Sequence, residues 1–202
     1  MYIAPVDAGT DESEWRGFVT RQGFGHLAVC GPDLPVVVPT QFVLSDDEVL
    51  LHLVARNPIF DALAERPLAL LSVAGDWAFI PSDWKAIGEE DPLLGIPTTY
   101  YGAVQLSGPV TVVDDPAELA AILRRQLADA QPGVAVATPE AAHGSRLPSI
   151  RGLRLQIEQV RAKFKYGGNV DAPHRRAVAE RLVARGGPGD AVAAAHTLRR
   201  LA

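Results

Sequence analysis

Short apolar runs separated by turn residues follow one another through most of the chain, in a pattern typical of β-strands. β-branched and aromatic residues fill 36–43, Ser45-Asp46-Asp47 supplies turn chemistry, and a second apolar run covers 49–54. These two runs predict a β-hairpin. The strand expected at 77–80 follows a turn at Gly75-Asp76. Further strands are predicted, in chain order, at 24–30, 68–73, 98–113 and 153–157.

Helical periodicity occurs only at isolated places between these strands. Asp11 and Glu14 form a capping-box pair at the start of the first helix, and Gly23 ends it. Other helices are predicted after Asn57-Pro58, from Asp115-Pro116, from Asp171 to Gly186 and over 190–201. A strict strand–helix alternation is missing. The pattern therefore fits a mainly β (α+β) fold, a closed antiparallel barrel of six or seven strands with helical additions.

The same pattern predicts how the chain is organised. Residues 1–170 are interpreted as one barrel domain with a helical insert at about 115–130, and 171–202 as a C-terminal helical extension. The segment 86–97 is rich in Gly, Pro, Glu and Asp and is expected to be an exposed loop. The segment 131–149 has no periodicity and is interpreted as a mobile loop or a lid.

Composition narrows the class of protein. A chain of 202 residues with 48% hydrophobic residues can bury a sizeable core. The net charge of −5 argues against broad, sequence-independent binding to nucleic acid. The single cysteine excludes an intramolecular disulfide, and Cys30 is interpreted as an inert core thiol. Neither a signal peptide nor an apolar run of membrane-spanning length is visible, so a soluble, cytoplasmic protein without a membrane partner is expected.

The first candidate for chemistry is the end of the second hairpin strand. His52, Arg56 and Asn57 lie where this strand is expected to end and a helix to begin. Free backbone N–H groups together with a guanidinium favour an anion there, and phosphate is the natural guest. The alternative is that Arg56 is a solvated residue at the helix start and Asn57 only a cap.

Three further groups are candidates, and the lysine group is the most telling of them. Ser82 and Trp84 could instead be a surface turn with a partly buried aromatic plug, and Thr98, Thr99, Tyr100 and Tyr101 could be simply good strand formers. Lys163 and Lys165 share one face of a predicted strand and repel each other unless an anion lies between them. Asn169 follows directly, but lysines protecting an edge strand are a real alternative.

Several familiar catalytic patterns are missing. There is no GxGxxG after a strand, no P-loop, no HExxH and no GxSxG. The five histidines have no metal-ligand spacing, so no metal site is predicted. Catalytic residues cannot be assigned from the sequence.

Six segments follow one another in order along the chain, the opening MYI and the later FGHLAV, HLVARNP, AFIPSDW, IPTTYYGAVQLSG and KFKYGGNVDAPHRRAVAERL. Together they resemble one known family, the PaiB-type FMN-binding negative transcriptional regulators. The resemblance covers nearly the whole chain. It implies a six-stranded antiparallel split β-barrel, related to pyridoxamine 5′-phosphate oxidases, that forms a homodimer with FMN at the subunit interface.

The resemblance also implies roles for individual residues. It makes His52, Arg56 and Asn57 the phosphate corner, and places Ser82, Trp84 and Thr98 in segments that face the flavin. Lys163, Lys165 and Asn169 match the family's C-terminal basic element. Thr40 lies in a strand that departs from the family's His-x-Pro-Phe, because the chain has Pro39-Thr40-Gln41-Phe42 there. This version looks more like the oxidoreductase side of the superfamily, and Thr40 is counted among the cofactor-binding residues.

Three functions follow as hypotheses. The first is an FMN-binding regulatory or redox protein of the PaiB-like type. The second is an FMN-dependent oxidoreductase, in which the cofactor supplies the chemistry. The third is a member without flavin that acts as an interaction module or binds haem. DNA binding is implied by the family label, but no segment forms a convincing helix-turn-helix.

Overall fold

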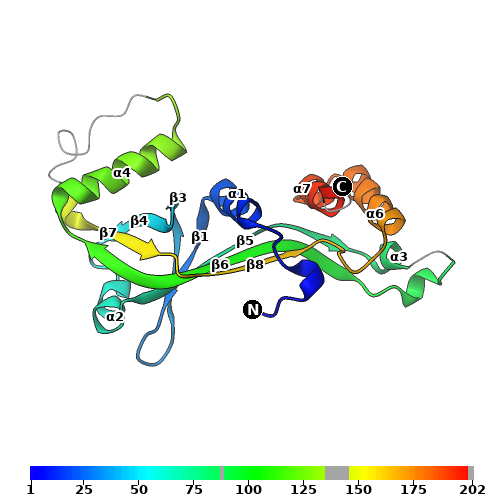
Figure 1. Ribbon diagram of the computed structural model, residues 1–202, viewed down its shortest axis with the longest axis horizontal. Coiled ribbons are helices and arrows are strands. Elements are labelled where there is room, and N and C mark those ends of the chain that lie inside the picture. The colour runs from blue at the N-terminus through cyan, green and yellow to red at the C-terminus, as the bar shows by residue number, and fades with distance from the viewer. Residues whose placement is uncertain (87–88, 135–145, 200–202) are drawn as a thin grey trace. The chain divides into compact units, whose positions relative to one another are not determined.

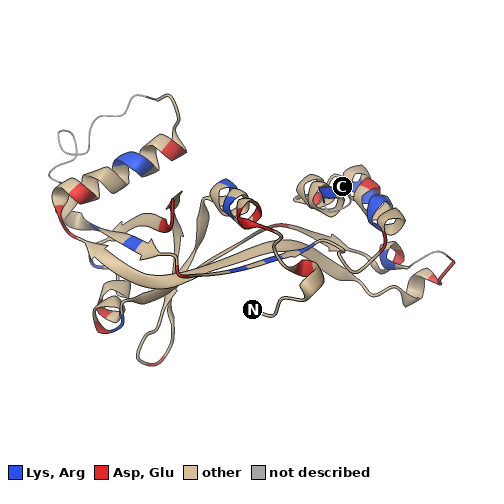
Figure 2. Cartoon of the chain, viewed as in Figure 1, with Lys and Arg blue, Asp and Glu red and all other residues tan. Residues whose placement is uncertain are grey.

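A computed structural model describes residues 1–86, 89–134 and 146–199 of the chain (Figure 1). The α-helices of these residues are α1 (Glu12–Gln22), α2 (Ile59–Glu65), α3 (Ser82–Lys85), α4 (Pro116–Ala130), α6 (Ala172–Arg185) and α7 (Asp190–Arg199). The strands are β1 (Phe24–Val29), β2 (Val36–Gln41), β3 (Val43–Ser45), β4 (Glu48–Val54), β5 (Leu68–Ile80), β6 (Thr98–Val113), β7 (Ile150–Gln156) and β8 (Gln159–Lys165). Helix α6 carries charges of both signs (Figure 2).

The described strands form one sheet in the order β2-β1-β5-β6-β7-β4-β3, with β8 paired to β6. Only Phe42 separates β2 from β3, so the chain itself joins the two ends of this path. Phe42 is buried, and its backbone N–H donates to the carbonyl of Gly23. Such a path curls a sheet round on itself, as in a barrel. The predicted α+β fold, an antiparallel barrel with added helices, is confirmed, although the described residues form eight strands rather than the six or seven expected.

One strand pairing differs from its prediction. The hairpin expected between 36–43 and 49–54 exists only in its last part, because β3 alone pairs with β4, through the turn at Asp46. Strand β2 pairs with β1, with Val36 opposite Val29. The turn at Gly31-Pro32-Asp33 folds β2 back on β1 before the chain reaches Phe42. Buried Phe42 then directs the chain to the other end of the sheet.

Two local predictions are also wrong. The residues 77–80 do not follow a turn, because β5 continues unbroken from Leu68 to Ile80. Asp76 has a φ of 52° within this strand, and its carbonyl accepts a hydrogen bond of 2.8 Å from the Tyr166 hydroxyl. A distant side chain therefore holds the local irregularity inside the strand. Cys30 lies just after β1 and is exposed, so it is not a core thiol.

The loop predictions are tested only in part. In the segment 86–97, Pro92–Leu94 forms a short 3-10 helix, and Leu93 and Ile96 are exposed. Most of the predicted lid at 131–149 lies outside the described residues. Its last part, Leu147–Ser149, is a 3-10 helix that contains a buried Leu147.

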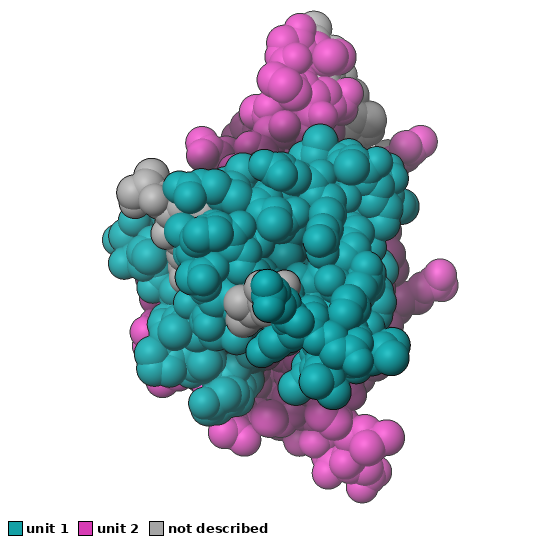
Figure 3. All heavy atoms as spheres, turned by 90° about the vertical axis from the view of Figure 1, so that its right-hand side faces the viewer, with its two compact units in different colours: residues 1–15, 74–103, 162–202 teal, residues 16–73, 104–161 magenta. Residues whose placement is uncertain are grey.

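The chain divides into two compact units (Figure 3). Unit 2 comprises residues 16–73 and 104–161, and unit 1 comprises residues 1–15, 74–103 and 162–202. Unit 2 contains the strand path from β2 to β3, with helix α4 against it. Leu50, Val113 and Ile122 form a buried cluster between α4 and the strands.

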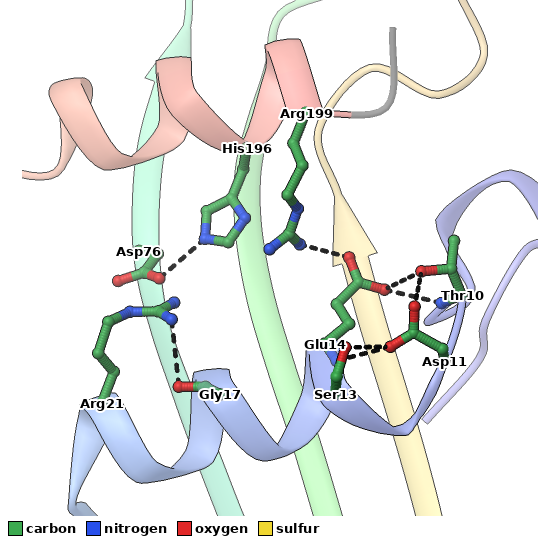
Figure 4. A network of polar contacts seen from close by, with 9 residues as sticks. All are labelled: Thr10, Asp11, Ser13, Glu14, Gly17, Arg21, Asp76, His196 and Arg199. Atoms are coloured by element: carbon green, nitrogen blue, oxygen red, sulfur yellow. Dashed lines mark hydrogen bonds and ion pairs between the residues drawn. The ribbon is translucent and has the colours of Figure 1, made fainter. Parts of the chain in front are cut away.

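Polar contacts fasten helix α7 within unit 1. His196 and Arg199 project from α7, His196 to Asp76 of β5 at 3.0 Å and Arg199 to the carboxylate of Glu14 (Figure 4). The His196 ring also stacks on Tyr166, with the ring centroids 4.5 Å apart. Glu14 in turn accepts a hydrogen bond of 2.7 Å from the backbone N–H of Thr10. The C-terminal helix is therefore tied to the N-terminal segment of the same unit.

Replacing Asp190 by alanine is expected to destabilise unit 1 by about 2 kcal/mol, which is typical of a lost charged hydrogen bond. The Asp190 side chain is 1% exposed and accepts hydrogen bonds from Arg185, at 2.6 and 2.8 Å, and from the backbone N–H of Gly187. Thermal unfolding of the variant at pH 7 measures the loss. The exposed Asp129→Ala change is the control and should be near neutral. Equal melting temperatures for the two variants would contradict this role.

The same carboxylate predicts a pH dependence. The Arg185 hydrogen bonds hold the pKa of Asp190 below its usual value. Because folding lowers this pKa, the stabilisation is present above pH ~4 and disappears as the pH falls through the folded pKa. The gap in stability between the wild type and Asp190→Ala should therefore narrow in acid.

Candidate functional site

The predicted phosphate corner lies in unit 2, where β4 leads into α2. The Asn57 side-chain oxygen accepts a hydrogen bond of 3.1 Å from the N–H of Ile59, and its carbonyl accepts one of 3.2 Å from Phe60. Asn57 therefore caps α2, and two of the backbone donors expected to be free are already bonded. Arg56 is exposed, and its guanidinium has no hydrogen-bond or ion-pair partner among the described residues. Any anion held here depends mainly on Arg56.

His52 and Thr40 line a cavity of about 580 Å³ in unit 2, which we call the α4 cavity. Most of its wall is apolar. The lining residues are Phe24, Pro39, Thr40, Gln41, His52, Leu123, Gln126, Leu127, Ala130, Arg146, Leu147 and Ile150. A mainly apolar cavity with a few convergent polar groups is the usual form of a small-molecule site, and its volume lies within the usual range of about 300–1,000 Å³.

The polar floor of the α4 cavity, meaning the polar part of its lining, contains a hydrogen bond between β4 and α4. The Nδ1 atom of His52 lies 2.6 Å from Oε1 of Gln126 in α4. Gly152 of β7 makes this approach possible, because a Cβ atom there would lie 2.8 Å from Ile122 of α4. An amide oxygen only accepts hydrogen bonds, so this contact requires a proton on Nδ1 of His52, and in that neutral tautomer Nε2 is an acceptor.

Gln126 was missed by the sequence analysis, although a signal for it exists. It is 7% exposed, on the buried face of α4. A polar side chain on the apolar stripe of a helix is expected to have a buried partner, because an unpaired buried amide is costly. The pattern could not show that this partner is His52, which is 74 residues away in sequence.

The remaining candidates lie in unit 1. Ser82 and Trp84 belong to the single-turn helix α3, where the carbonyl of Ser82 accepts from the N–H of Ala86. The guanidinium of Arg185 lies 4.9 Å from the centre of the Trp84 ring. Trp84 is half-buried and has a packing role within unit 1.

Thr98, Lys165 and Asn169 line a second cavity of about 500 Å³, which we call the Lys165 cavity. The Nζ atom of Lys165 donates to the Thr98 hydroxyl at 2.6 Å. Lys163 does not line this cavity. Its Nζ atom lies 4.0 Å from the Asp7 carboxylate and donates to the carbonyl of Tyr2 at 3.2 Å. The two lysines expected to share an anion therefore have different partners.

Lys85 and Tyr100 also line the Lys165 cavity. Burial, and then the charge of Lys165, lowers the pKa of Lys85. Tyr100 is 1% exposed, and its hydroxyl has no hydrogen-bond partner among the described residues. Burial raises the pKa of Tyr100 to about 12, so the hydroxyl stays protonated and available as a donor at neutral pH. The sequence showed Tyr100 only as a strand former.

Metal-binding clusters and membrane-spanning helices are both absent from the described part of the chain. No group of three His, Cys, Asp or Glu side chains there is placed to hold a metal ion. None of the described helices is long and apolar enough to span a membrane.

The class of the chain follows from a family model. Residues 1–159 match the model of the family described as "Putative FMN-binding domain", and the chain belongs to this family. No curated protein matches the chain.

Solved structures show the same fold at low sequence identity. The flavocytochrome Anf3 from Azotobacter vinelandii is 19% identical, with a TM-score of 0.64, over 83% of this chain and 73% of that one. The FAD and haem binding protein from Mycobacterium smegmatis is 21% identical, with a TM-score of 0.63, over 90% and 80%. A conserved hypothetical protein from Mycobacterium tuberculosis is 16% identical, with a TM-score of 0.61, over 85% and 94%.

The cofactor of this family, FMN, fits the residues that unit 2 provides. An isoalloxazine ring is planar and largely apolar, with polar atoms along one edge. The α4 cavity offers apolar walls together with the polar side chains of Thr40, His52 and Gln126. Arg56 offers the cation that a phosphate requires. The chain is therefore a flavoprotein by family, and unit 2 has the chemistry to hold the cofactor.

Proposed function

We propose that the chain is an FMN-dependent redox protein that binds the flavin ring in the α4 cavity and the phosphate at Arg56. The observation that carries the proposal is the Arg56 guanidinium, which has no partner in the part of the chain that the structure describes, in the same unit as a mainly apolar cavity with a polar floor. Bound FMN supplies the transfer of electrons or hydride. The protein needs only to bind, orient and desolvate the ring.

Each residue then has a defined task. Leu123, Leu127 and Ile150 pack on the ring and exclude water. Gln126 holds the His52 ring in one orientation, with Nε2 free to accept a hydrogen bond from the flavin. Arg56 binds the phosphate, and Asn57 contributes indirectly by capping α2.

A redox role is better supported than the PaiB-type regulatory role. DNA binding by the C-terminal helices would need free basic side chains, yet several arginines of α6 and α7 are engaged within unit 1. Arg185 binds Asp190, Arg199 binds Glu14, and Arg181 donates to the carbonyl of Asp83 at 3.1 Å. Acidic side chains also stand among the basic ones of these helices (Figure 2). Such a mixed surface does not favour a polyanion.

We also propose that the functional form is a homodimer. Strand β5 carries two large apolar side chains that are exposed, Trp77 at 59% and Phe79 at 50%. Exposed aromatic residues close together are typical of an interface. Light scattering of the purified protein tests this directly, and a monomer at micromolar concentration would contradict it.

The test of the main proposal is optical. Protein loaded with FMN and then desalted is expected to keep a two-band flavin spectrum. Reduced nicotinamide or reduced deazaflavin is then expected to bleach this spectrum without added DNA. A protein that keeps FMN but is reduced by neither donor, and that retards a DNA fragment, would favour the regulatory role instead.

Haem binding is a second candidate function, and the His52 geometry favours it. Histidines that bind a metal through one ring nitrogen usually donate the other N–H to a protein oxygen, as His52 does to Gln126. The apolar wall of the α4 cavity also suits a porphyrin. Titration with haemin distinguishes the candidates, because a Soret band lost in His52→Ala but kept in His26→Ala would indicate axial ligation by His52.

A further inference from the structure

We infer that the Lys165 cavity of unit 1 is an anion-binding site for a phosphate or carboxylate group, built from Lys85, Lys165 and the Tyr100 hydroxyl. This site uses none of the side chains that we assign to FMN in unit 2. It therefore stands independently of the proposed function.

The first feature of this cavity is a buried hydroxyl. Tyr100 is almost fully buried, lines the cavity and has no hydrogen-bond partner for its hydroxyl among the described residues. Leaving such a donor unpaired destabilises the folded protein. A ligand oxygen in the cavity would satisfy it. Because the hydroxyl stays protonated at neutral pH, it is a donor and suits an anion.

The backbone packs closely against this hydroxyl. Gly167 lines the cavity with a φ of 76°, and a Cβ atom there would lie 2.3 Å from the Tyr100 hydroxyl oxygen. A side chain at position 167 would be strained and would displace the hydroxyl. Asn169 lines the same cavity, is exposed, and could add an amide donor.

Two lysines supply the charge. Lys85 and Lys165 both line the cavity, and each is partly shielded from solvent. Lys165 is directed by the Thr98 hydroxyl, which is neutral and does not itself compensate the charge. The proximity of the two cations is costly in the empty cavity and becomes favourable when an anion lies between them. Glu90 also lines the cavity, so the three charged side chains leave a net charge of +1.

A histidine also lies within range of the Lys85 charge. His174 lies at the start of α6, and burial followed by the charge of Lys85 lowers its pKa. Nearby Asp171 opposes this effect but is the N-cap of α6, with its carboxylate bonded to the backbone N–H of His174. The Asp171 carboxylate is therefore no better placed than a bound anion to pair with Lys85.

The test measures the binding of inorganic phosphate to the whole chain by titration calorimetry at low ionic strength. The wild type is expected to bind phosphate, and added sodium chloride should weaken that binding. Lys85→Met and Lys165→Met are each expected to weaken it at least tenfold, and Tyr100→Phe severalfold. Circular dichroism establishes that each variant is folded.

Lys163→Met is the matched control, because Lys163 lies on the same strand but contacts Asp7 and does not line the cavity. Its phosphate affinity should stay within twofold of the wild type. Absence of phosphate binding by the wild type would overturn the inference. So would equal affinities for the wild type, Lys85→Met and Lys165→Met.

Running the titration with and without FMN identifies the source of the anion. Phosphate binding that persists in the FMN-loaded protein assigns the cavity to a second, anionic ligand. Phosphate binding that FMN blocks, but riboflavin does not, assigns it to the phosphate of the flavin. The Arg56→Ala variant separates the two sites. If this variant no longer binds FMN, its phosphate titration still measures binding at the Lys165 cavity.

Discussion

Replacing Arg56 by alanine is expected to weaken FMN binding by roughly 30- to 100-fold. One charge-assisted contact to a phosphate contributes about 2–3 kcal/mol, and each 1.4 kcal/mol changes affinity tenfold. The capping role of Asn57 means that few backbone donors remain at the start of α2 to replace the guanidinium. Fluorescence titration of the flavin-free protein measures the change.

Two controls make this result specific. Riboflavin lacks the phosphate, so its affinity should be the same for the wild type and Arg56→Ala. Arg66→Ala, at the far end of α2, removes another exposed arginine and should leave FMN affinity unchanged. Equal loss of FMN and riboflavin binding in Arg56→Ala would place the phosphate elsewhere and give Arg56 only a structural role.

Replacing Gly108 by alanine is expected to destabilise the barrel by about 3 kcal/mol, the upper end of the usual cost of overpacking. A Cβ atom at Gly108 would lie 2.0 Å from the carbonyl oxygen of Gln156 in β7. The neighbouring backbone cannot easily yield, because Glu158 donates to the carbonyl of Ser107 at 3.0 Å. The melting temperature should fall by roughly 6–12 °C for a domain of this size.

Gly17→Ala is the matched control for Gly108→Ala. Nothing lies within 4 Å of a Cβ atom at Gly17, which is inside helix α1. This change should therefore be neutral or stabilise by about 0.5–1 kcal/mol. If Gly108→Ala melts at the temperature of Gly17→Ala, the close approach of β6 and β7 does not constrain position 108.

Elements set by local chemistry were predictable from the sequence. Strand β6 has the expected limits, Thr98–Val113, and helix α6 begins at the expected cap Asp171, whose carboxylate bonds the N–H of His174. The apolar stripe of α4 and its Asp115 cap were equally visible. In each case the signal lies within a few residues of the element that it determines.

Features set by partners far away in sequence were not predictable. β-branched residues showed that 36–41 is a strand, but its pairing with β1 depends on the turn before it and on buried Phe42. Asp76 keeps a positive φ inside a strand because Tyr166 bonds its carbonyl. The candidate residues were found by type, whereas their separation into an α4 cavity and a Lys165 cavity depends on the whole sheet.

Strand pairing also determines when the barrel can be completed during translation. Strand β4 leaves the ribosome early, but its partner β7 lies about a hundred residues later, with Leu51 opposite Leu153. Strands β5 and β6 each run through both units, and all of 74–103 must be made between the two segments of unit 2. The nascent chain thus carries an unpaired β4 edge until β7 emerges, a state prone to aggregation. Expression at low temperature or with added chaperone should therefore raise the soluble yield.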